Sequence, residues 1–504
     1  MAEATDNPVA AGLDRGRQAP PVALVVFGAS GDLTHRKLLP ALAELARRHQ
    51  LGDAFTVVGV ARSDMSDDSF RQLAVEAAHE AGPEWEQAVK GFRYVTGDYG
   101  EAATFDRLAQ VLGEVDSERG TGGYRVYYLA TIPDQFGPVA GHLGEHGLSR
   151  PAEGSFCRLV VEKPFGRDLD SSAALDAQLH AAFDEDQIYR IDHYLGKETV
   201  QNVLALRFAN AIFEPVWNRR YVDSVQVTVA ESLGVGHRGG FYETAGALRD
   251  IVQNHVMQIL GLTLLEPPAT VDAQGIRDEK VKVLRAVEVM TPDEVPNAVV
   301  RGQYDRGWVE GEEVPGYREE EGVAPDSQTE TFVAMRLVVD NWRWAGVPVY
   351  VRTGKRLPKR VTEVAMTFHR VPHLPFASSL SRDLAPNALV VRVQPDEGVT
   401  FCFGAKVPGP GFKVRTVSMD FSYGAAFLEN PPDSYERLLL DAMVGDPTLF
   451  IRTDEVEQSW RIVQPILEAW GDGATPLHRY AAGSWGPRES HRLLEAAGRR
   501  WRRP

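Results

Sequence analysis

An eight-residue stretch with the sequence Arg-Ile-Asp-His-Tyr-Leu-Gly-Lys gathers chemically active side chains in one short piece of chain. Arg190 and Lys197 at its ends are cations, and Asp192 is an anion. His193 titrates near neutral pH, and Tyr194 carries a phenol. A pocket that holds a phosphorylated substrate beside an acid–base pair needs these residue types. A solvated surface can carry them too, so the surrounding elements decide between the two interpretations.

The composition is that of an ordinary globular protein, with 504 residues, of which 43% are hydrophobic and 25% charged. At about 150 residues per domain, this length predicts two to four domains. The net charge of −16 argues against nucleic acid and anionic membranes as partners. No apolar run approaches the ~20 residues of a membrane span, so we predict no membrane segment. An anionic substrate would need a local basic pocket.

The two cysteines, Cys157 and Cys402, each lie within an apolar segment. Two isolated cysteines provide neither a disulfide framework nor a zinc site. We therefore interpret them as free thiols, and we expect a cytoplasmic protein with no metal in its site.

The chain begins like a dinucleotide-binding unit. Residues 23–27 form an apolar run that predicts a strand buried on both faces. Gly28 and Gly31 follow, and leucines at helical spacing come next. Glycines at this point allow a tight turn and let backbone N–H groups approach a pyrophosphate. The spacing is G-x-x-G rather than G-x-G-x-x-G, so a plain tight turn remains an alternative.

A second predicted strand, residues 55–60, runs into Ala61, Arg62 and Ser63. In such a fold this position contacts the adenosine ribose, where an acidic residue binds the 2′-OH of NAD and an arginine accommodates the 2′-phosphate of NADP. Arg62 and Ser63 therefore favour NADP, and an exposed loop arginine is the alternative.

Predicted strands and helices alternate through the first two hundred residues, which indicates a parallel, doubly wound sheet. Ligands of such a sheet bind beyond the carboxyl ends of its strands. Gly31, Arg62, Thr131 and Lys163 all follow predicted strands. We therefore expect these residues to share one ligand site.

The pattern then changes to alternation of period two in residues 222–230, as in a half-buried antiparallel strand that ends at Glu231. Residues 243–265 predict a helix with an apolar stripe that includes His255. A histidine on such a stripe is more often part of the core; the alternative is a partly desolvated general base. Asp250 lies five residues earlier, roughly 140° round an ideal helix, and is badly placed to orient His255.

Several stretches together resemble the glucose-6-phosphate dehydrogenase family, in the family's order and spacing. They are residues 27–33, 162–166, 190–197, 249–255 and 352–355. The resemblance runs from about residue 22 to beyond residue 480, and the octet 190–197 is close to diagnostic. It implies oxidation of D-glucose 6-phosphate to 6-phospho-D-glucono-1,5-lactone with hydride transfer to NADP, the first step of the oxidative pentose phosphate pathway.

The resemblance also implies the architecture. We expect an α/β Rossmann-like doubly wound N-terminal domain and an α+β C-terminal domain with a large, mostly antiparallel sheet used in dimer contacts. The predicted boundaries are a disordered extension over residues 1–20, an NADP-binding domain over 21–203 and a substrate and dimerisation domain over 204–504. The chain is expected to form a homodimer or homotetramer.

By the same resemblance, His255 takes the proton of the anomeric hydroxyl, and Asp192 orients its imidazole. The bond between Lys163 and Pro164 is expected to be cis. The implied substrate-binding residues are Lys163, His193, Tyr194, Lys197, Glu231, Asp250, Lys355 and Arg360. The implied cofactor-binding residues are Gly28, Ser30, Gly31, Asp32, Leu33, Arg62, Ser63 and Lys163.

Two other functions fit part of the pattern. One is a Rossmann sugar oxidoreductase of the glucose–fructose oxidoreductase type, which also carries Glu-Lys-Pro after a strand but lacks the octet. The other is a catalytically silent regulatory homologue, which would be expected to have lost His255, Asp192 or Lys197.

Overall fold

The computed structural model describes residues 17–504, except residues 79–80, 376–383 and 428–432. By spatial proximity the chain divides into two compact units, which are described separately. Unit 1 comprises Met1–Lys197, Thr270–Arg277 and Pro432–Glu457, and unit 2 comprises Glu198–Ala269, Asp278–Pro431 and Gln458–Pro504. The predicted domain boundaries at residues 20 and 203 remain a prediction.

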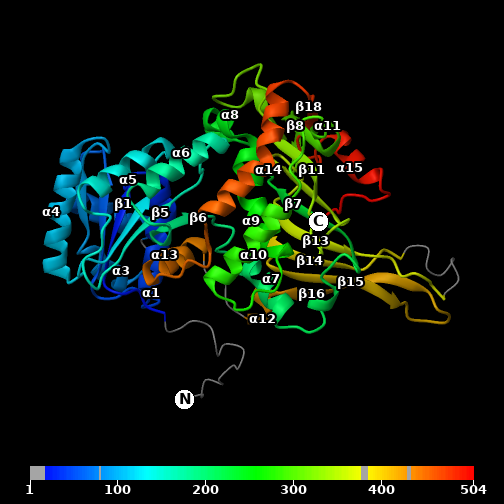
Figure 1. Cartoon of the computed structure of the whole chain (residues 1–504), viewed down its shortest axis with the longest axis horizontal. Helices are drawn as coiled ribbons and strands as arrows, with labels where there is room; N and C mark the ends of the chain where they lie inside the picture. The colour runs from blue at the N-terminus through cyan, green and yellow to red at the C-terminus, as the bar shows by residue number, and fades with distance from the viewer. Residues whose placement is uncertain (1–16, 79–80, 376–383, 428–432) are drawn as a thin grey trace, which may run out of the picture. The chain divides into compact units, whose positions relative to one another are not determined.

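Unit 1 is built on a sheet that, within the described residues, has seven strands in the order β17-β6-β5-β4-β1-β2-β3. β1 pairs in parallel with both β2 and β4, so the strand order reverses at β1. Helices lie on both sides of the sheet (Figure 1), which is why every residue of β1 is buried. This arrangement confirms the predicted doubly wound α/β fold. Its strands are β1 (Val22–Phe27), β2 (Phe55–Ala61), β3 (Arg93–Thr96), β4 (Arg125–Leu129), β5 (Cys157–Val161), β6 (Ile188–Ile191) and β17 (Phe450–Ile451).

The helices of unit 1 connect these strands and pack on the sheet. A π-helical turn, η1 (Thr34–Leu38), continues into α1 (Leu39–Arg47), which carries Pro40 at its second residue. The others are α2 (Asp67–Ala77), α3 (Pro83–Val89), α4 (Ala102–Arg119), α5 (Phe136–Glu145), α6 (Leu169–His180) and α13 (Ser434–Val444).

A late segment of the chain completes unit 1. β17 pairs antiparallel with β6, and the same segment supplies α13. Arg17 donates to Asp441 of α13 and to Asp446 just after it, at 2.9 and 2.8 Å. Arg17 belongs to the predicted N-terminal extension, and residues 1–16 of that extension lie outside the described residues.

Unit 2 contains a second sheet, with nine strands among the described residues in the order β16-β15-β14-β13-β7-β12-β11-β8-β18. β7 pairs in parallel with β12, and β8 with β18; the other pairs are antiparallel. The predicted large, mostly antiparallel sheet is therefore confirmed. Its strands are β7 (Val222–Ala230), β8 (Val299–Asp305), β11 (Phe332–Val338), β12 (Pro348–Gly354), β13 (Val361–Phe368), β14 (Ala388–Gln394), β15 (Gly398–Lys406), β16 (Val414–Ser422) and β18 (Leu477–Ala481).

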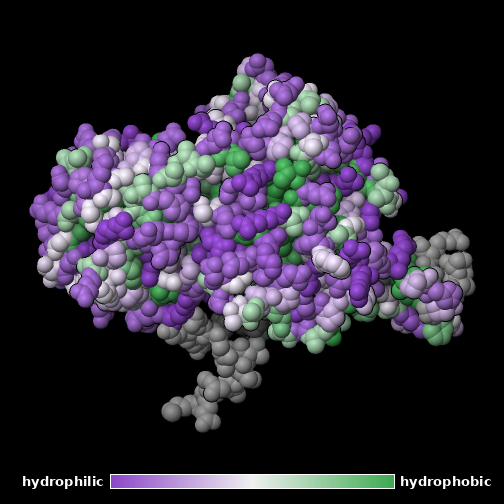
Figure 2. Space-filling model, in the orientation of Figure 1, coloured by the Kyte–Doolittle hydropathy of each residue, from purple (hydrophilic) through white to green (hydrophobic). Residues whose placement is uncertain are grey.

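Helices pack beside this sheet, and β9 (Gly307–Val309) and β10 (Glu312–Val314) form a separate hairpin. The helices are α7 (Glu198–Phe208), α8 (Gly239–Ala247), α9 (Met257–Leu264), α11 (Val295–Ala298), α12 (Tyr423–Phe427) and α15 (Arg492–Glu495), while α10 (Ala273–Ala286) and α14 (Thr453–Gly471) run across the division between the units. In the part of the chain that the structure describes, no helix has both the length and the apolarity to cross a membrane. Hydrophilic residues make up most of the face shown in Figure 2.

The single helix predicted over residues 243–265 is wrong, because the chain breaks at Gly246 (φ 65°, ψ 174°). A Cβ at Gly246 would lie 2.3 Å from Glu330 Oε1, which leaves only glycine room there. That same oxygen accepts the backbone N–H of Leu248 at 3.0 Å and so caps the next helix. This helix, η6 (Leu248–Val256), is a π-helix that continues into α9. Tertiary contacts to Glu330 override the helical periodicity of the sequence.

Candidate active site

A pocket of about 370 Å³ opens in unit 1 where the loops after β1, β2 and β4 meet. This is the point at which the strand order reverses, and open α/β sheets bind their ligands there. Gly28 has φ 92°, and a Cβ there would lie 2.3 Å from the carbonyl oxygen of Ala130. The glycine thus permits both the turn and close packing against the strand end. The pocket is lined by Gly28, Ser30, Gly31, Ala61, Arg62, Ser63, Asp98, Tyr99, Ala130, Thr131, Ile132 and Gln135.

The pocket brings together most of the residues predicted to bind the cofactor, namely Gly28, Ser30, Gly31, Arg62 and Ser63. The Oγ atoms of Ser30 and Ser63 lie 3.0 Å apart, so the glycine turn and the end of β2 meet. Asp32, Leu33 and Lys163 are not among the residues that line this pocket. The exposed Asp32 pairs instead with Arg36 on its own helical turn, at 2.7 Å.

Hydroxyl groups and one arginine are among the side chains that line the pocket. Arg62 is exposed, and an acidic residue of the NAD type does not occupy its position at the end of β2. Tyr94 donates its hydroxyl to the backbone oxygen of Ser63 at 2.9 Å and so fixes that loop. The pocket therefore fits a pyridine dinucleotide.

Tyr99 is a pocket residue that was not predicted from the sequence. Its ring is 6% exposed and packs edge-on against Phe27 of β1. Burial raises the pKa of the Tyr99 phenol, while a backbone hydrogen bond at Gly28 and the charge of Arg62 act in the opposite direction. Its position shortly after β3 could have pointed to it, because the residues after each parallel strand face the same edge.

The predicted Glu-Lys-Pro segment follows β5, and the expected cis bond between Lys163 and Pro164 is confirmed. The preceding Glu162 accepts hydrogen bonds from Tyr128 at 2.6 Å and from Tyr435 at 3.3 Å. Burial raises the pKa of the Glu162 carboxyl. Two tyrosines, one of them contributed by α13, therefore hold the backbone on which Lys163 sits.

Two side chains of the octet 190–197, Arg190 and Asp192, make contacts within unit 1 that fix the end of β6. Arg190, in β6, is 2% exposed and binds Asp176 and Glu185 at 2.7 and 2.8 Å. It therefore holds unit 1 together. Asp192 is also 2% exposed, and its Oδ1 accepts the backbone N–H of Tyr194 at 2.9 Å, which closes the turn after β6.

The three residues predicted to bind the substrate phosphate lie together after that turn. The ring centroids of His193 and Tyr194 are 4.9 Å apart, and the Lys197 ammonium lies 5.4 Å from the Tyr194 ring centroid. An imidazole, a phenol and an ammonium at these distances supply the donors that a phosphate monoester binds.

Unit 2 gathers a second group of predicted substrate residues at the ends of β7 and β12. The Lys355 ammonium donates to Glu231 Oε2 at 2.6 Å, and the Lys355 and Glu231 side chains are 5% and 33% exposed. The same ammonium lies 5.0 Å from the ring centroid of Tyr242. Burial raises the pKa of Tyr242 well above its usual value, and the carboxylates of Asp250, Glu330 and Glu231 raise it further. Glu231, Tyr242, Asp250 and Lys355 thus form one cluster.

Tyr242 was also not predicted from the sequence. It is 3% exposed, and its hydroxyl has no hydrogen-bond partner within the described residues. Tyr242 lies in a glycine-rich segment whose sequence has no helical periodicity, so no periodic pattern predicted it. It stands four residues before the break at Gly246, near the end of a helix.

Two residues near this cluster have other surroundings. Arg360 is exposed just before β13 and donates to Gln394 at 3.1 Å. Arg352 of the predicted 352–355 motif is 1% exposed, with Trp485 and Trp501 at 4.6 and 4.9 Å from its guanidinium. Burial lowers the pKa of Arg352 to about 10. Arg352 therefore anchors the C-terminal segment.

His255 is 1% exposed on the π-helix η6. In an α-helix Asp250 would lie about 140° away from it, but a π-helix hydrogen bond links residues five apart, so they lie about one turn from each other. The α-helical geometry behind the predicted 140° separation is therefore wrong, while the orientation of His255 by a residue other than Asp250 stays a prediction. Asp192 belongs to unit 1 and His255 to unit 2, and their pairing stays a prediction.

The doubly wound sheet and its pocket define a dinucleotide-binding oxidoreductase fold, joined in one chain to an antiparallel α+β unit. Two family models match it: the NAD binding domain of glucose-6-phosphate dehydrogenase over residues 25–202 and the C-terminal domain of the same enzyme over residues 204–502. The chain belongs to the glucose-6-phosphate dehydrogenase family. The glucose–fructose oxidoreductase alternative is thereby set aside.

Individual relatives match over almost their full length. Glucose-6-phosphate 1-dehydrogenase 2 of Mycobacterium tuberculosis is 49% identical over 494 residues, which cover 97% of this chain and 96% of that protein. Glucose-6-phosphate 1-dehydrogenase of Aggregatibacter actinomycetemcomitans is 48% identical over 485 residues, or 95% of this chain and 97% of that protein. A solved glucose-6-phosphate dehydrogenase in complex with glucose-6-phosphate has a TM-score of 0.88 and 33% identity, and the match covers 97% of this chain and 100% of that one. The crystal structure from Mycobacterium avium has a TM-score of 0.81 and 38% identity, with 96% and 99% covered.

Proposed function

We propose that this protein oxidises D-glucose 6-phosphate to 6-phospho-D-glucono-1,5-lactone and reduces NADP, as the first step of the oxidative pentose phosphate pathway. The observation that carries the proposal is 49% identity to a glucose-6-phosphate 1-dehydrogenase over 97% of the chain. The presence of His255, Asp192 and Lys197 supports an active enzyme rather than a silent homologue.

The reaction needs a base for the anomeric hydroxyl and rigid positioning of the sugar. His255 takes that proton, and its burial keeps water from competing for it. Asp192 orients the imidazole and stabilises the imidazolium that forms, as the carboxylate of a catalytic triad does. NADP, when bound, accepts the hydride from the carbon that carries the anomeric hydroxyl.

The phosphate and the sugar hydroxyls are held by separate groups of residues. His193, Tyr194 and Lys197 donate to the phosphate oxygens. Glu231 and Asp250 accept hydrogen bonds from the sugar hydroxyls, and Lys163, Lys355 and Arg360 are further proposed substrate contacts. The ion pair between Lys355 and Glu231 supports this assignment, because it fixes a donor and an acceptor side by side.

NADP rather than NAD is the proposed cofactor. Arg62 and the hydroxyls of Ser30 and Ser63 line the pocket and suit a ribose 2′-phosphate. Gly28 and Gly31 allow the backbone to approach the pyrophosphate, and Asp32, Leu33 and Lys163 complete the proposed cofactor contacts.

We further propose a homodimer or homotetramer that forms through the sheet of unit 2. β16 is an edge strand of that sheet, and Val417, Met419 and Phe421 on it are 40%, 63% and 38% exposed. An edge with exposed apolar side chains at alternate positions is suited to an interface. The family models meet near residue 203, which supports the domain division proposed there. Two free cysteines suit a cytoplasmic location.

The deciding experiment mixes purified protein with glucose 6-phosphate and either NADP or NAD and follows reduced-nicotinamide absorbance. We expect turnover with glucose 6-phosphate and little with free glucose. The absence of turnover with either cofactor would leave the silent homologue as the answer. His255→Asn should lower kcat far more than it raises KM, whereas Lys197→Ala should mainly raise KM for the phosphorylated sugar.

A further inference from the structure

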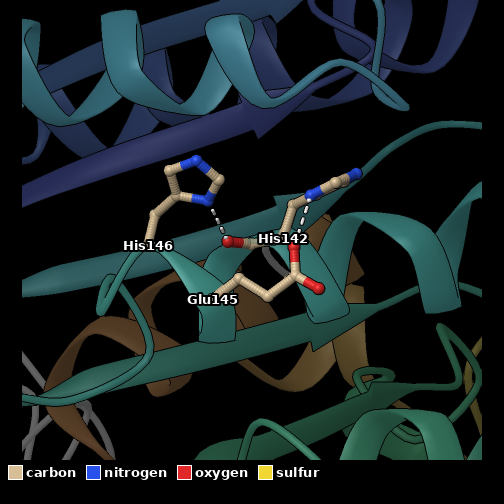
Figure 3. Close-up of side chains that lie close together, drawn as sticks. All are labelled: His142, Glu145 and His146. Carbon is tan, nitrogen blue, oxygen red and sulfur yellow. Dashed lines mark hydrogen bonds and ion pairs between the residues drawn. The ribbon is translucent and has the colours of Figure 1, made fainter.

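Two histidines and a glutamate meet on one side of α5 in unit 1. His142, Glu145 and His146 each offer one ligand atom, and these atoms lie within 4.8 Å of one another. The spacing His-x-x-Glu-His puts both imidazoles on one face, because residues four apart are neighbours on a helix. Figure 3 shows the three side chains at the C-terminal end of the helix.

The hydrogen bonds fix which imidazole nitrogen is available. Nδ1 of His146 lies 2.8 Å from the backbone oxygen of His142, and since that oxygen can only accept, Nδ1 carries the proton (Figure 3). A neutral His146 therefore presents the lone pair of Nε2. Nδ1 of His142 is likewise 2.9 Å from Glu145 Oε2. His146 shows the pattern of metal-binding histidines, whose second nitrogen is held by a carbonyl or carboxylate. Glu145, as a ligand, would exchange its contact with His142 for the ion.

A second helix places another carboxylate beside His146. The Oδ1 atom of Asp106, in α4, lies 3.5 Å from the Nε2 atom of His146. Phe105, the preceding residue, packs against both imidazoles, with ring centroids 4.9 and 5.7 Å away. The imidazoles are therefore largely enclosed, at 22% and 16% exposure, while the carboxylates of Glu145 and Asp106 are 69% and 75% exposed and can rotate.

We propose that this cluster, here called the α5 site, binds a transition-metal dication of the Zn²⁺ class. Two imidazoles with one or two carboxylates form a ligand set that zinc accepts. Ligand atoms round a tetrahedral zinc lie roughly 3.4 Å apart, so the widest pair closes by at most about 1.4 Å, which rotation of the exposed carboxylates can supply. The net charge of −16 favours cation binding.

The charges near the α5 site distinguish it from a similar group in unit 1. Asp176, His180 and Glu185 also lie close together, but Arg190 donates to both of those carboxylates. The charge of these two carboxylates is therefore partly neutralised by Arg190. Within the described residues, neither Asp106 nor Glu145 pairs with a lysine or arginine. The α5 site therefore keeps its negative charge available to a cation.

The α5 site is separate from the cofactor pocket. Gln135 lines that pocket immediately before α5, and His142 lies seven residues later, roughly 10 Å along the helix at 1.5 Å per residue. A bound ion would join α5 to α4 and stabilise unit 1 while leaving the pocket open. The expectation of no metal rested on the two cysteines and did not take this histidine spacing into account.

The test uses tag-free, full-length protein treated with a chelator and titrated with Zn²⁺ by calorimetry, with thermal unfolding followed in parallel. We expect one zinc-binding event in which His142→Ala or His146→Ala weakens affinity about ten- to a hundredfold, with loss of the thermal stabilisation. Co²⁺ should give visible absorption bands in the wild type that the double variant lacks. Asp106→Asn, which leaves the His146 hydrogen bond to its carbonyl intact, should weaken binding less.

His180→Ala is the matched control and should bind zinc like the wild type. Unchanged zinc affinity in the His142→Ala/His146→Ala double variant would overturn the proposal, as would loss of binding in His180→Ala alone. If the histidines only cap the helix, the variants will lower the thermal stability of the chelated protein, and added zinc will stabilise wild type and variants equally. That result would also overturn the proposal.

Discussion

The ion pair between Lys355 and Glu231 leads to an asymmetric prediction. At a separation of 2.6 Å the attraction is about 6 kcal/mol at an effective dielectric constant of ~20, before desolvation is subtracted. The two ends differ in exposure, since the Lys355 side chain is 5% exposed and the Glu231 side chain 33%. Removing Glu231, the more exposed partner, leaves a buried ammonium without its counter-ion. Removing Lys355, the buried partner, leaves a carboxylate that water can reach.

We therefore expect Glu231→Ala to lower the free energy of unfolding by about 3 kcal/mol, the low end for a broken buried pair. Lys355→Met keeps the apolar stem and should cost only about 1 kcal/mol, mainly from the lost contact with the Tyr242 ring. The double variant should be less destabilised than the sum of the two, with a coupling of about 1–2 kcal/mol.

Urea unfolding at pH 7, followed by tryptophan fluorescence, measures all four proteins under one set of conditions. Steady-state kinetics on the same samples separates stability from substrate binding, because both single variants should also raise KM for the sugar phosphate. If Lys355→Met costs as much as Glu231→Ala, the difference in burial does not control the energetics and the reasoning is refuted. A coupling free energy near zero would show that the ion pair behaves as a surface contact and adds no net stability.

Three further predictions follow from other parts of the chain. Gly28→Ala should abolish cofactor binding and lower the free energy of unfolding by more than the ~1–2 kcal/mol that a left-handed conformation costs an L-residue, because its Cβ would meet the Ala130 carbonyl. The matched control Gly113→Ala, in open space on α4, should raise the free energy of unfolding by about 0.5–1 kcal/mol. Equal effects of the two variants in urea unfolding would contradict this prediction. Burial raises the pKa of Asp441 to about 6, so the folded state keeps a proton there that the unfolded state releases near pH 4. The contribution of this group to the free energy of unfolding therefore falls as pH rises from about 4 to 6. Asp441→Asn should remove up to about 3 kcal/mol of that fall, measured by comparing the unfolding free energies of wild type and variant across this pH range. Arg62→Ala should raise KM for NADP at least tenfold and leave KM for NAD nearly unchanged, and a parallel loss for both cofactors would argue against a role for Arg62 at the 2′-phosphate.

Much of the fold could be predicted because its signals are local. The apolar run of β1 followed by Gly28 is short in sequence, and a strand buried on both faces leaves the same pattern wherever it occurs. The alternation of β7 predicts an antiparallel strand for the same reason. Residues at strand ends, such as Arg62, could therefore be assigned to a common edge from the amino-acid sequence alone.

Long-range contacts decided what the sequence could not. Glu330, distant in sequence in the loop before β11, caps η6. The segment that carries Asp250 and His255 is a π-helix, so its facing residues differ from those of an α-helix. α13 and β17 return to unit 1 from late in the chain, and they bring Tyr435 to Glu162.

The octet 190–197 shows the same division. Its residue types are those that phosphate binding and acid–base chemistry need, although a solvated surface can carry them too. The tertiary structure alone decided that Arg190 is buried and paired with the partly exposed Asp176 and Glu185, while Lys197 stays partly exposed beside Tyr194. Sequence determines which charges are present, but burial and the partners that folding brings to each charge determine which of them is left to bind a ligand.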